Sequence, residues 1–125
     1  MASLSKNKII TMNRADTFKF PFYIAIGSAV NYVLYDMVPG DKLYFAVLEP
    51  HQKWEDALIK KTYTYEDYDE ENHRVMIRFV PEDTEYVKPG NYYYQVKLYR
   101  PSENVLDGYE AIDTLIPRTK FIILE

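Results

Sequence analysis

Short apolar stretches that alternate with polar residues constrain this chain most. In residues 17–26 every even position is apolar, and a repeat of two residues is what a strand with one buried face requires. Pro21 lies inside this stretch, and because proline has no amide hydrogen to give to a ladder, we expect an edge strand or a bulged strand there. Helical periodicity is scarce in the rest of the chain, so the sequence predicts an all-β fold.

The same alternation recurs between clusters of Pro, Gly, Asn and Asp. The further strands are expected at 8–12, 42–48, 57–65, 74–80, 92–99, 109–116 and 119–124, the last two interrupted at Pro117. In 92–99 one set of alternating residues is expected to face the core, namely Tyr92, Tyr94, Val96 and Leu98. For residues 81–90 we expect one helical turn at most.

Seven or eight such strands without intervening helices favour a single antiparallel β-sandwich, since each apolar face needs a second sheet to cover it. A small barrel is the alternative architecture. The chain has 125 residues, the size of one domain. We expect residues 1–125 to form that domain, with 1–6 as a flexible N-terminal segment.

Residues 83–92 have the pattern of a tyrosine corner. A polar turn beginning at Asp83 and a glycine at Gly90 precede Tyr92 at the start of a strongly alternating strand. In such a corner the tyrosine hydroxyl bonds back to the backbone a few residues upstream, an arrangement typical of immunoglobulin-like sandwiches. The sequence therefore predicts an immunoglobulin-like version of the sandwich.

Charge and hydropathy exclude several classes of partner. Fifteen Lys and Arg stand against 19 Asp and Glu, a net charge of -4, so the chain has no basic excess to neutralise nucleic-acid phosphates or an anionic membrane. The least polar stretch, 22–38, is too short and too polar to span a bilayer, and the N-terminus lacks the apolar core of a signal peptide. With no cysteine, disulfides and thiolate chemistry are excluded as well.

No pattern of metal ligands is evident. His51 and His73 each lie in a polar loop without a second histidine at ligand spacing. A calcium loop counted from Asp67 would have Asn72 at its sixth position and Arg78 at its twelfth, where glycine and glutamate are needed. We interpret the acidic segment 66–71 as a solvated hairpin whose charges discourage edge pairing, and we expect neither metal nor cofactor.

No catalytic motif is evident either. Ser3, Ser5, Ser28 and Ser102 lack the context of a nucleophile elbow or a triad. Carboxylates are plentiful enough that a glycosidase pair stays as a remote alternative. The prediction is that the protein is not an enzyme.

Tyrosine is the one compositional deviation, with 13 residues, and tyrosine and tryptophan are enriched at recognition surfaces. The only tryptophan, Trp54, is either a loop anchor packed onto the sandwich or an exposed residue that docks on a partner. The candidate interaction surface comprises Trp54, Tyr44, Tyr63, Tyr93 and Tyr99, with the tyrosines expected on outward faces.

Four segments carry a resemblance to a known group of proteins: GDKLYFAVLEP, EDALIKKTYT, RFVPEDTEYVKPGNYYYQVKL and DTLIPRTKFIILE. Together they resemble the N-terminal β-sandwich domain of phage baseplate upper proteins and related tail or head-fibre accessory domains, over 16–124. The resemblance implies fold and virion context, but no activity, cofactor or binding residue. Baseplate upper proteins carry this domain at the head of a longer chain, so we expect a free-standing member here.

Residues and resemblance together predict a non-enzymatic structural component of a bacteriophage virion, made in the bacterial cytoplasm. It would act in the baseplate, tail, head fibre or capsid decoration, and bind other virion proteins or copies of itself, but not nucleic acid or membrane. The alternative is a carbohydrate-binding module that recognises a host glycan through Tyr93, Tyr99 and Trp54.

Overall fold

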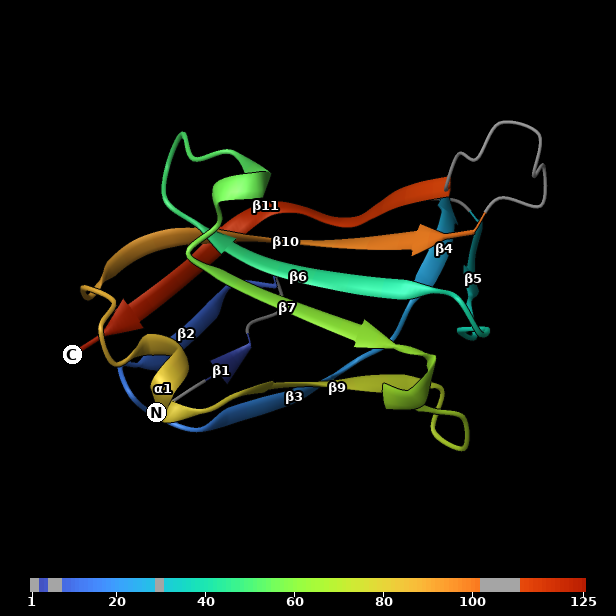
Figure 1. The fold of residues 1–125 in the computed structure, drawn as a ribbon, viewed down its shortest axis with the longest axis horizontal. Coiled ribbons are helices and arrows are strands. Elements are labelled where there is room, and N and C mark those ends of the chain that lie inside the picture. The colour runs from blue at the N-terminus through green and yellow to red at the C-terminus, as the bar shows by residue number, and fades with distance from the viewer. Residues whose placement is uncertain (1–2, 5–7, 29–30, 102–110) are drawn as a thin grey trace.

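The computed structural model describes residues 3–4, 8–28, 31–101 and 111–125, most of which lie in strands (Figure 1). The strands are β1 (Ser3–Leu4), β2 (Ile10–Asn13), β3 (Phe18–Phe22), β4 (Ala25–Ser28), β5 (Asn31–Leu34), β6 (Lys42–Leu48), β7 (Ile59–Thr64), β8 (Tyr68–Asp69), β9 (Arg74–Phe79), β10 (Gly90–Arg100) and β11 (Ala111–Leu124). The prediction of an all-β fold is confirmed.

The helical elements are single turns. They are the 3-10 helices η1 (Trp54–Asp56) and η2 (Tyr65–Asp67) and the α-helical turn α1 (Pro81–Thr84), which is the one turn expected in 81–90. In the described ranges no helix has the length and apolar character needed to cross a membrane.

Six strands form the larger sheet, in the order β1-β2-β11-β10-β6-β7. Every neighbouring pair in it is antiparallel except β2 and β11, which run parallel. A second sheet has the order β3-β9-β8, and β4 and β5 pair as a separate hairpin. Most of the expected flexible segment 1–6 lies outside the described residues, but Ser3–Leu4 is the strand that pairs with β2.

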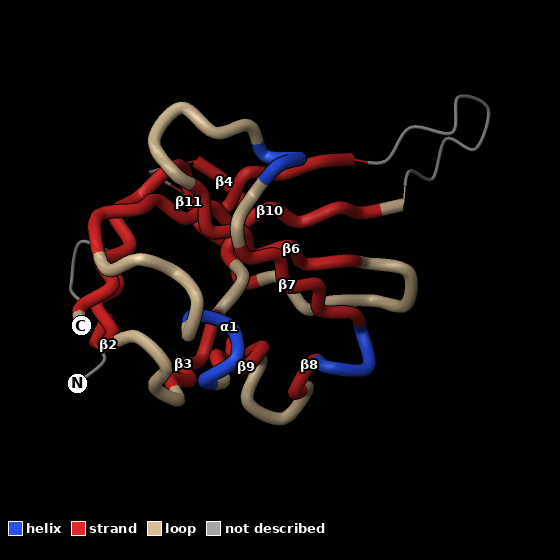
Figure 2. Tube along the Cα trace, turned by 60° about the vertical axis from the view of Figure 1, so that its left-hand side comes forward, coloured by secondary structure: helices blue, strands red, loops and turns tan. Residues whose placement is uncertain are grey.

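The two main sheets face each other (Figure 2). Aromatic rings belong to the core cluster that lies between them. Phe45 of β6 lies 6.3 Å from Phe20 of β3 and 5.5 Å from Phe79 of β9, measured between ring centroids. Within the larger sheet Phe45 also stacks on Tyr94, at 5.2 Å. All four side chains are almost inaccessible to solvent, so one continuous core fills the space between the sheets.

The strand expected over 17–26 is two strands. β3 ends at Phe22, and β4 begins at Ala25 and pairs with β5 instead. The placement of Pro21 is as predicted, because β3 is an edge strand of its sheet. In β10 the predicted alternation is confirmed: Tyr92, Tyr94, Val96 and Leu98 are all buried.

Pro117 does not interrupt the last strand, contrary to expectation. β11 continues from Ala111 to Leu124, and the two residues of the expected strand before Ala111 lie outside the described ranges. The ladder between β10 and β11 shifts register between Tyr94 and Val96, which places Pro117 in a bulge. A bulged residue makes no ladder bond, so proline is tolerated there.

The turn before β6 requires a glycine. Gly40 has a φ of +98° and, if it carried a Cβ, that atom would lie 2.9 Å from Cγ of Pro101. Asp41 then closes the turn, with its amide donating to the carbonyl of Val38 at 3.1 Å. Both the backbone angle and the contact with Pro101 exclude a larger residue.

The start of β10 is fixed by a tyrosine hydroxyl. Tyr92 donates from its hydroxyl to the carbonyl of Lys88 at 2.5 Å, four residues upstream. Burial raises the pKa of this hydroxyl, as expected for a phenol held in its neutral, donating form. Asp83 takes no part in this bond; its carboxylate instead accepts from the amide of Val80 and from Lys61.

Replacement of Tyr92 by Phe should lower the free energy of unfolding by about 0.5–1.5 kcal/mol, because one hydrogen bond is lost and the ring is kept. Urea unfolding followed by circular dichroism measures the change. Tyr86→Phe is the matched control, since Tyr86 is 92% exposed. Equal stability of the Tyr92→Phe variant and the wild type would contradict the role of this bond.

Replacement of Gly40 by Ala should cost about 1–3 kcal/mol, because alanine is strained at this φ and clashes with Pro101. The double variant Gly40→Ala/Pro101→Ala should recover only that part of the lost stability which the clash with Pro101 causes. Thermal unfolding of the three proteins measures both contributions. A Gly40→Ala variant as stable as the wild type would show that the turn can adopt another conformation.

Candidate interaction surface

The outer face of the larger sheet, which points away from β3-β9-β8, brings together three of the candidate tyrosines. Lys97 pairs with Tyr44 across β10 and β6, next to the buried pair Leu98 and Leu43. Since neighbouring residues of a strand point to opposite faces, Tyr44 and Lys97 point outward. Tyr93 and Tyr99 lie on the same face, four residues before and two residues after Lys97.

Trp54 joins this face from the connection between β6 and β7. The Lys97 ammonium lies 4.4 Å from the centroid of the indole ring, a cation–π contact. Tyr44 and Tyr99 meet edge to face with centroids 4.7 Å apart. We call Tyr44, Trp54, Tyr93, Lys97 and Tyr99 the outer aromatic surface; all five side chains are half-buried.

Two further residues of the outer face are buried, which the sequence analysis missed. Ala46 and Leu48 alternate with the inward Phe45 and Val47, yet are 1% and 0% exposed. The connection that carries η1 follows β6 directly (Figure 1), and η1 contacts this strand. The uninterrupted apolar run from Phe45 was the available signal, since a strand buried on both faces has no polar alternation.

A contact from the bulge in β11 holds this connection in place. The guanidinium of Arg118, next to Pro117, donates to the carbonyl of Gln52. The side chain of Gln52 in turn accepts from the amide of Glu49 at 2.9 Å. Trp54 is therefore carried by an anchored loop, and its half-buried ring contacts Lys97 of the outer face.

Tyr63 does not lie with the other tyrosines. It pairs with Leu43, which is buried, so it points toward the space between the sheets, where it packs against the core. Its hydroxyl accepts the amide of Arg78 at 3.2 Å, and burial raises its pKa. The expectation that Tyr63 lies outward is wrong for this reason.

The outer face is basic although the chain is acidic. Four lysines occupy described outward positions of β6, β7, β10 and β11, and none of the described outward positions carries a carboxylate; the lysines are Lys42, Lys60, Lys97 and Lys120. Arg118, in the bulge of β11, adds a further basic side chain that reaches the connection carrying η1. The connection that carries η1 has acidic residues at Glu55 and Asp56. A surface of tyrosine and lysine matches an acidic protein surface in charge.

Partly buried polar contacts fix the end of the sheet where Tyr44 and Tyr99 lie. The Asp41 carboxylate accepts the hydroxyl of Tyr35 at 2.6 Å and the amide of Val38 at 3.0 Å. Arg100, next to Tyr99, donates to Asp113 at 2.9 Å and lies over the ring of Tyr35. These contacts connect the ends of β6, β10 and β11, so the outer aromatic surface is positioned before any partner binds.

The polar groups on the other side of the molecule hold loops together. Asp36 accepts the hydroxyl of Tyr68 and lies 2.7 Å from Nδ1 of His73; the Tyr68 hydroxyl and His73 hold the pKa of Asp36 below its usual value. In the acidic segment, Asp69 accepts from the side chain of Asn72 at 2.7 Å. Among the described residues no group of three His, Asp or Glu side chains is placed to hold a metal ion.

A scan against models of protein families gives no match for this chain. Searches of curated proteins and of solved structures likewise give none. The geometry of the outer face is therefore the basis for inferring function.

The contact between Tyr35 and Asp41 should make stability depend on alkaline pH. Burial and the hydrogen bond to Asp41 raise the pKa of Tyr35 from 10.0 to about 12. The folded state therefore binds this proton more tightly than the unfolded state, so its contribution is complete below pH 10 and is lost as pH rises toward 12. The urea midpoint of the wild type should fall more steeply over this window than that of Tyr35→Phe.

Tyr86→Phe is again the control, and its urea midpoint should depend on pH in the same way as that of the wild type. Absorbance of tyrosinate at 295 nm reports ionisation directly. If Tyr35→Phe keeps the full alkaline loss of stability, the hydrogen bond to Asp41 does not contribute to it.

Proposed function

We propose that this protein is a non-enzymatic structural component of a bacteriophage particle, in which an immunoglobulin-like domain binds other particle proteins through the outer aromatic surface. The observation that carries the proposal is the grouping of Tyr44, Tyr93, Tyr99 and Trp54 with lysines on the outer face of one sheet. Tyrosine is enriched in protein interfaces because it combines a large apolar area with a polar tip.

The strand order supports the immunoglobulin-like part of the proposal. The sheet β3-β9-β8 corresponds to strands B, E and D of that fold, and β11-β10-β6-β7 corresponds to G, F, C and C′. In this correspondence Tyr92 stands at the start of strand F, where a tyrosine corner is found, and its hydroxyl bonds to the backbone of Lys88. The resemblance to phage baseplate and fibre domains supports the same assignment.

The geometry favours a protein partner over the alternative, a glycan. A sugar-binding platform needs free aromatic faces, but the Lys97 ammonium lies over the ring of Trp54. The rings of Tyr44 and Tyr99 are inclined by 70°, so they do not form one flat platform. Protein side chains, by contrast, fit an uneven surface with lysine donors at its centre.

Incorporation into particles tests the proposal. Phage particles are purified by density gradient from bacteria that produce the wild-type chain or the variant Tyr44→Ser/Tyr93→Ser, and the chain is quantified by mass spectrometry. The wild type should co-purify at a fixed ratio to the major particle proteins. The variant should be reduced about tenfold or more, since interface tyrosines often contribute more than 1 kcal/mol each.

Tyr86→Ser is the matched control, because Tyr86 is exposed outside the outer face, and it should be incorporated normally. Circular dichroism checks that each variant is folded. Absence of the wild-type chain from particles would overturn the proposal. Saturable binding to a glycan array that is lost in Trp54→Ala would favour the carbohydrate-binding module instead.

A further inference from the structure

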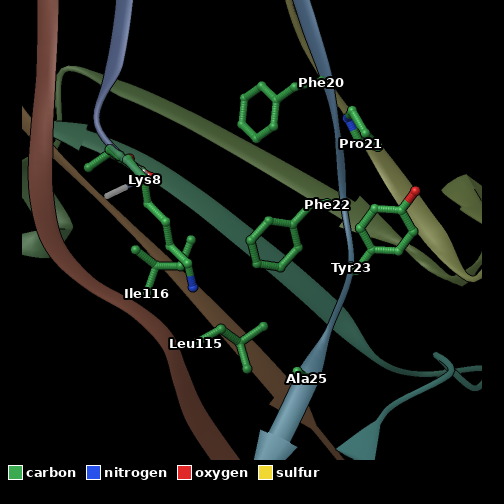
Figure 3. A pocket seen from close by; sticks show the side chains of 9 residues that line it. Lys8, Phe20, Pro21, Phe22, Tyr23, Ala25, Leu115 and Ile116 are labelled. Carbon is green, nitrogen blue, oxygen red and sulfur yellow. Dashed lines mark hydrogen bonds between the residues drawn. The ribbon is translucent and has the colours of Figure 1, made fainter. Parts of the chain in front are cut away.

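A pocket of about 480 Å³ lies between β3 and β4 on one side and β11 on the other (Figure 3). It is formed by different residues from the outer aromatic surface. Its walls are mainly apolar and aromatic, and they consist of Lys8, Phe20, Pro21, Phe22, Tyr23, Ala25, Tyr94, Leu115 and Ile116. Its volume is in the range of small-molecule sites, which are mostly apolar hollows with few polar groups.

The walls reach into the hydrophobic core. Phe20, Phe22 and Ile116 belong to the core cluster and are almost fully buried, so a molecule in the pocket would contact the interior of the protein. The hydroxyl of Tyr94 is engaged, because it donates to the carbonyl of Lys8. An occupant therefore meets hydrocarbon and ring surfaces over most of its length.

Of the described residues that line the pocket, Lys8 alone carries a charge. It has a φ of 62°, an uncommon backbone conformation for a residue with a side chain, and its carbonyl is held by Tyr94. Figure 3 shows its side chain extending toward Leu115 and Ile116. Among the described residues the Lys8 ammonium has no ion-pair partner, and no carboxylate lines the pocket.

We propose that this pocket binds a single-chain amphipathic anion, an alkyl carboxylate of the fatty-acid type. The tail lies against Phe20, Phe22 and Ile116, where burial of each methylene stabilises the complex. The carboxylate pairs with the ammonium of Lys8. This site is independent of the contact surface in the proposed function and adds a small-molecule ligand to it.

The same edge is unfavourable for an added peptide strand. β3 is the edge of its sheet, but Pro21 has no amide hydrogen to donate to a neighbouring strand. A strand added there would lack the ladder bond at Pro21, which is one of the residues that line the pocket. A ligand that needs no backbone hydrogen bonds fits the site better.

Calorimetric titration of the full chain with hexanoate, octanoate and decanoate, below their micelle concentrations, tests the proposal. Affinity should rise about fourfold with each added methylene, which corresponds to the free energy of about 0.8 kcal/mol gained on burying one methylene. Lys8→Gln should weaken decanoate about three- to fivefold, the range of an exposed ion pair, and leave 1-decanol unchanged. Ala25→Leu, which fills the pocket, should weaken both ligands at least tenfold.

Lys19→Gln is the matched control, since Lys19 is an exposed lysine on β3 that does not line the pocket. This variant should bind decanoate with the same affinity as the wild type. Near-ultraviolet circular dichroism verifies that each protein stays folded with and without ligand. The proposal is overturned if decanoate shows no saturable binding up to about millimolar concentration. It is also overturned if neither Lys8→Gln nor Ala25→Leu alters binding. Incorporation into particles is measured separately, so failure here leaves the proposed function standing.

Discussion

Phe45 and Phe79, which come from facing sheets, meet edge to face with centroids 5.5 Å apart, and Phe45 stacks on Tyr94 at the same time. This contact sets the register of β6, because a slip by one residue would turn Phe45 to solvent. With Phe45 directed inward, its neighbours Tyr44 and Ala46 must point outward. The aromatic core therefore determines which residues form the outer aromatic surface.

Much of the fold was predictable, because strands with one buried face follow the repeat of two. β10 is the clearest case. The hydrogen bond of Tyr92 near its start and the turn at Gly40 depend on local chemistry that the sequence displays. Pro117 was misread, since a strand break and a bulge have the same sequence signal. Only the pairing of β11 with β10, which is a long-range property, distinguishes the two.

The candidate site was predictable in part, for a related reason. Tyr44, Tyr93 and Tyr99 belong to strands whose apolar faces are unambiguous. In β7 both alternating sets contain lysine, so only the pairing of Tyr63 with Leu43 shows which set is inward. Trp54 lies on a loop, and its contact with Lys97 depends on how that loop folds over β6, for which the sequence has no repeat to follow.

The parallel pairing of β2 with β11 has a consequence for how the chain folds. Ile10 of β2 pairs with Phe121 of β11, so an early strand pairs with the last strand of the fold. Such distant contacts make folding slow, and the larger sheet cannot close while β11 is still inside the ribosome. Until then the edge of β10 that pairs with β11 has no partner, and an unpaired strand edge is open to aggregation or to chaperone binding.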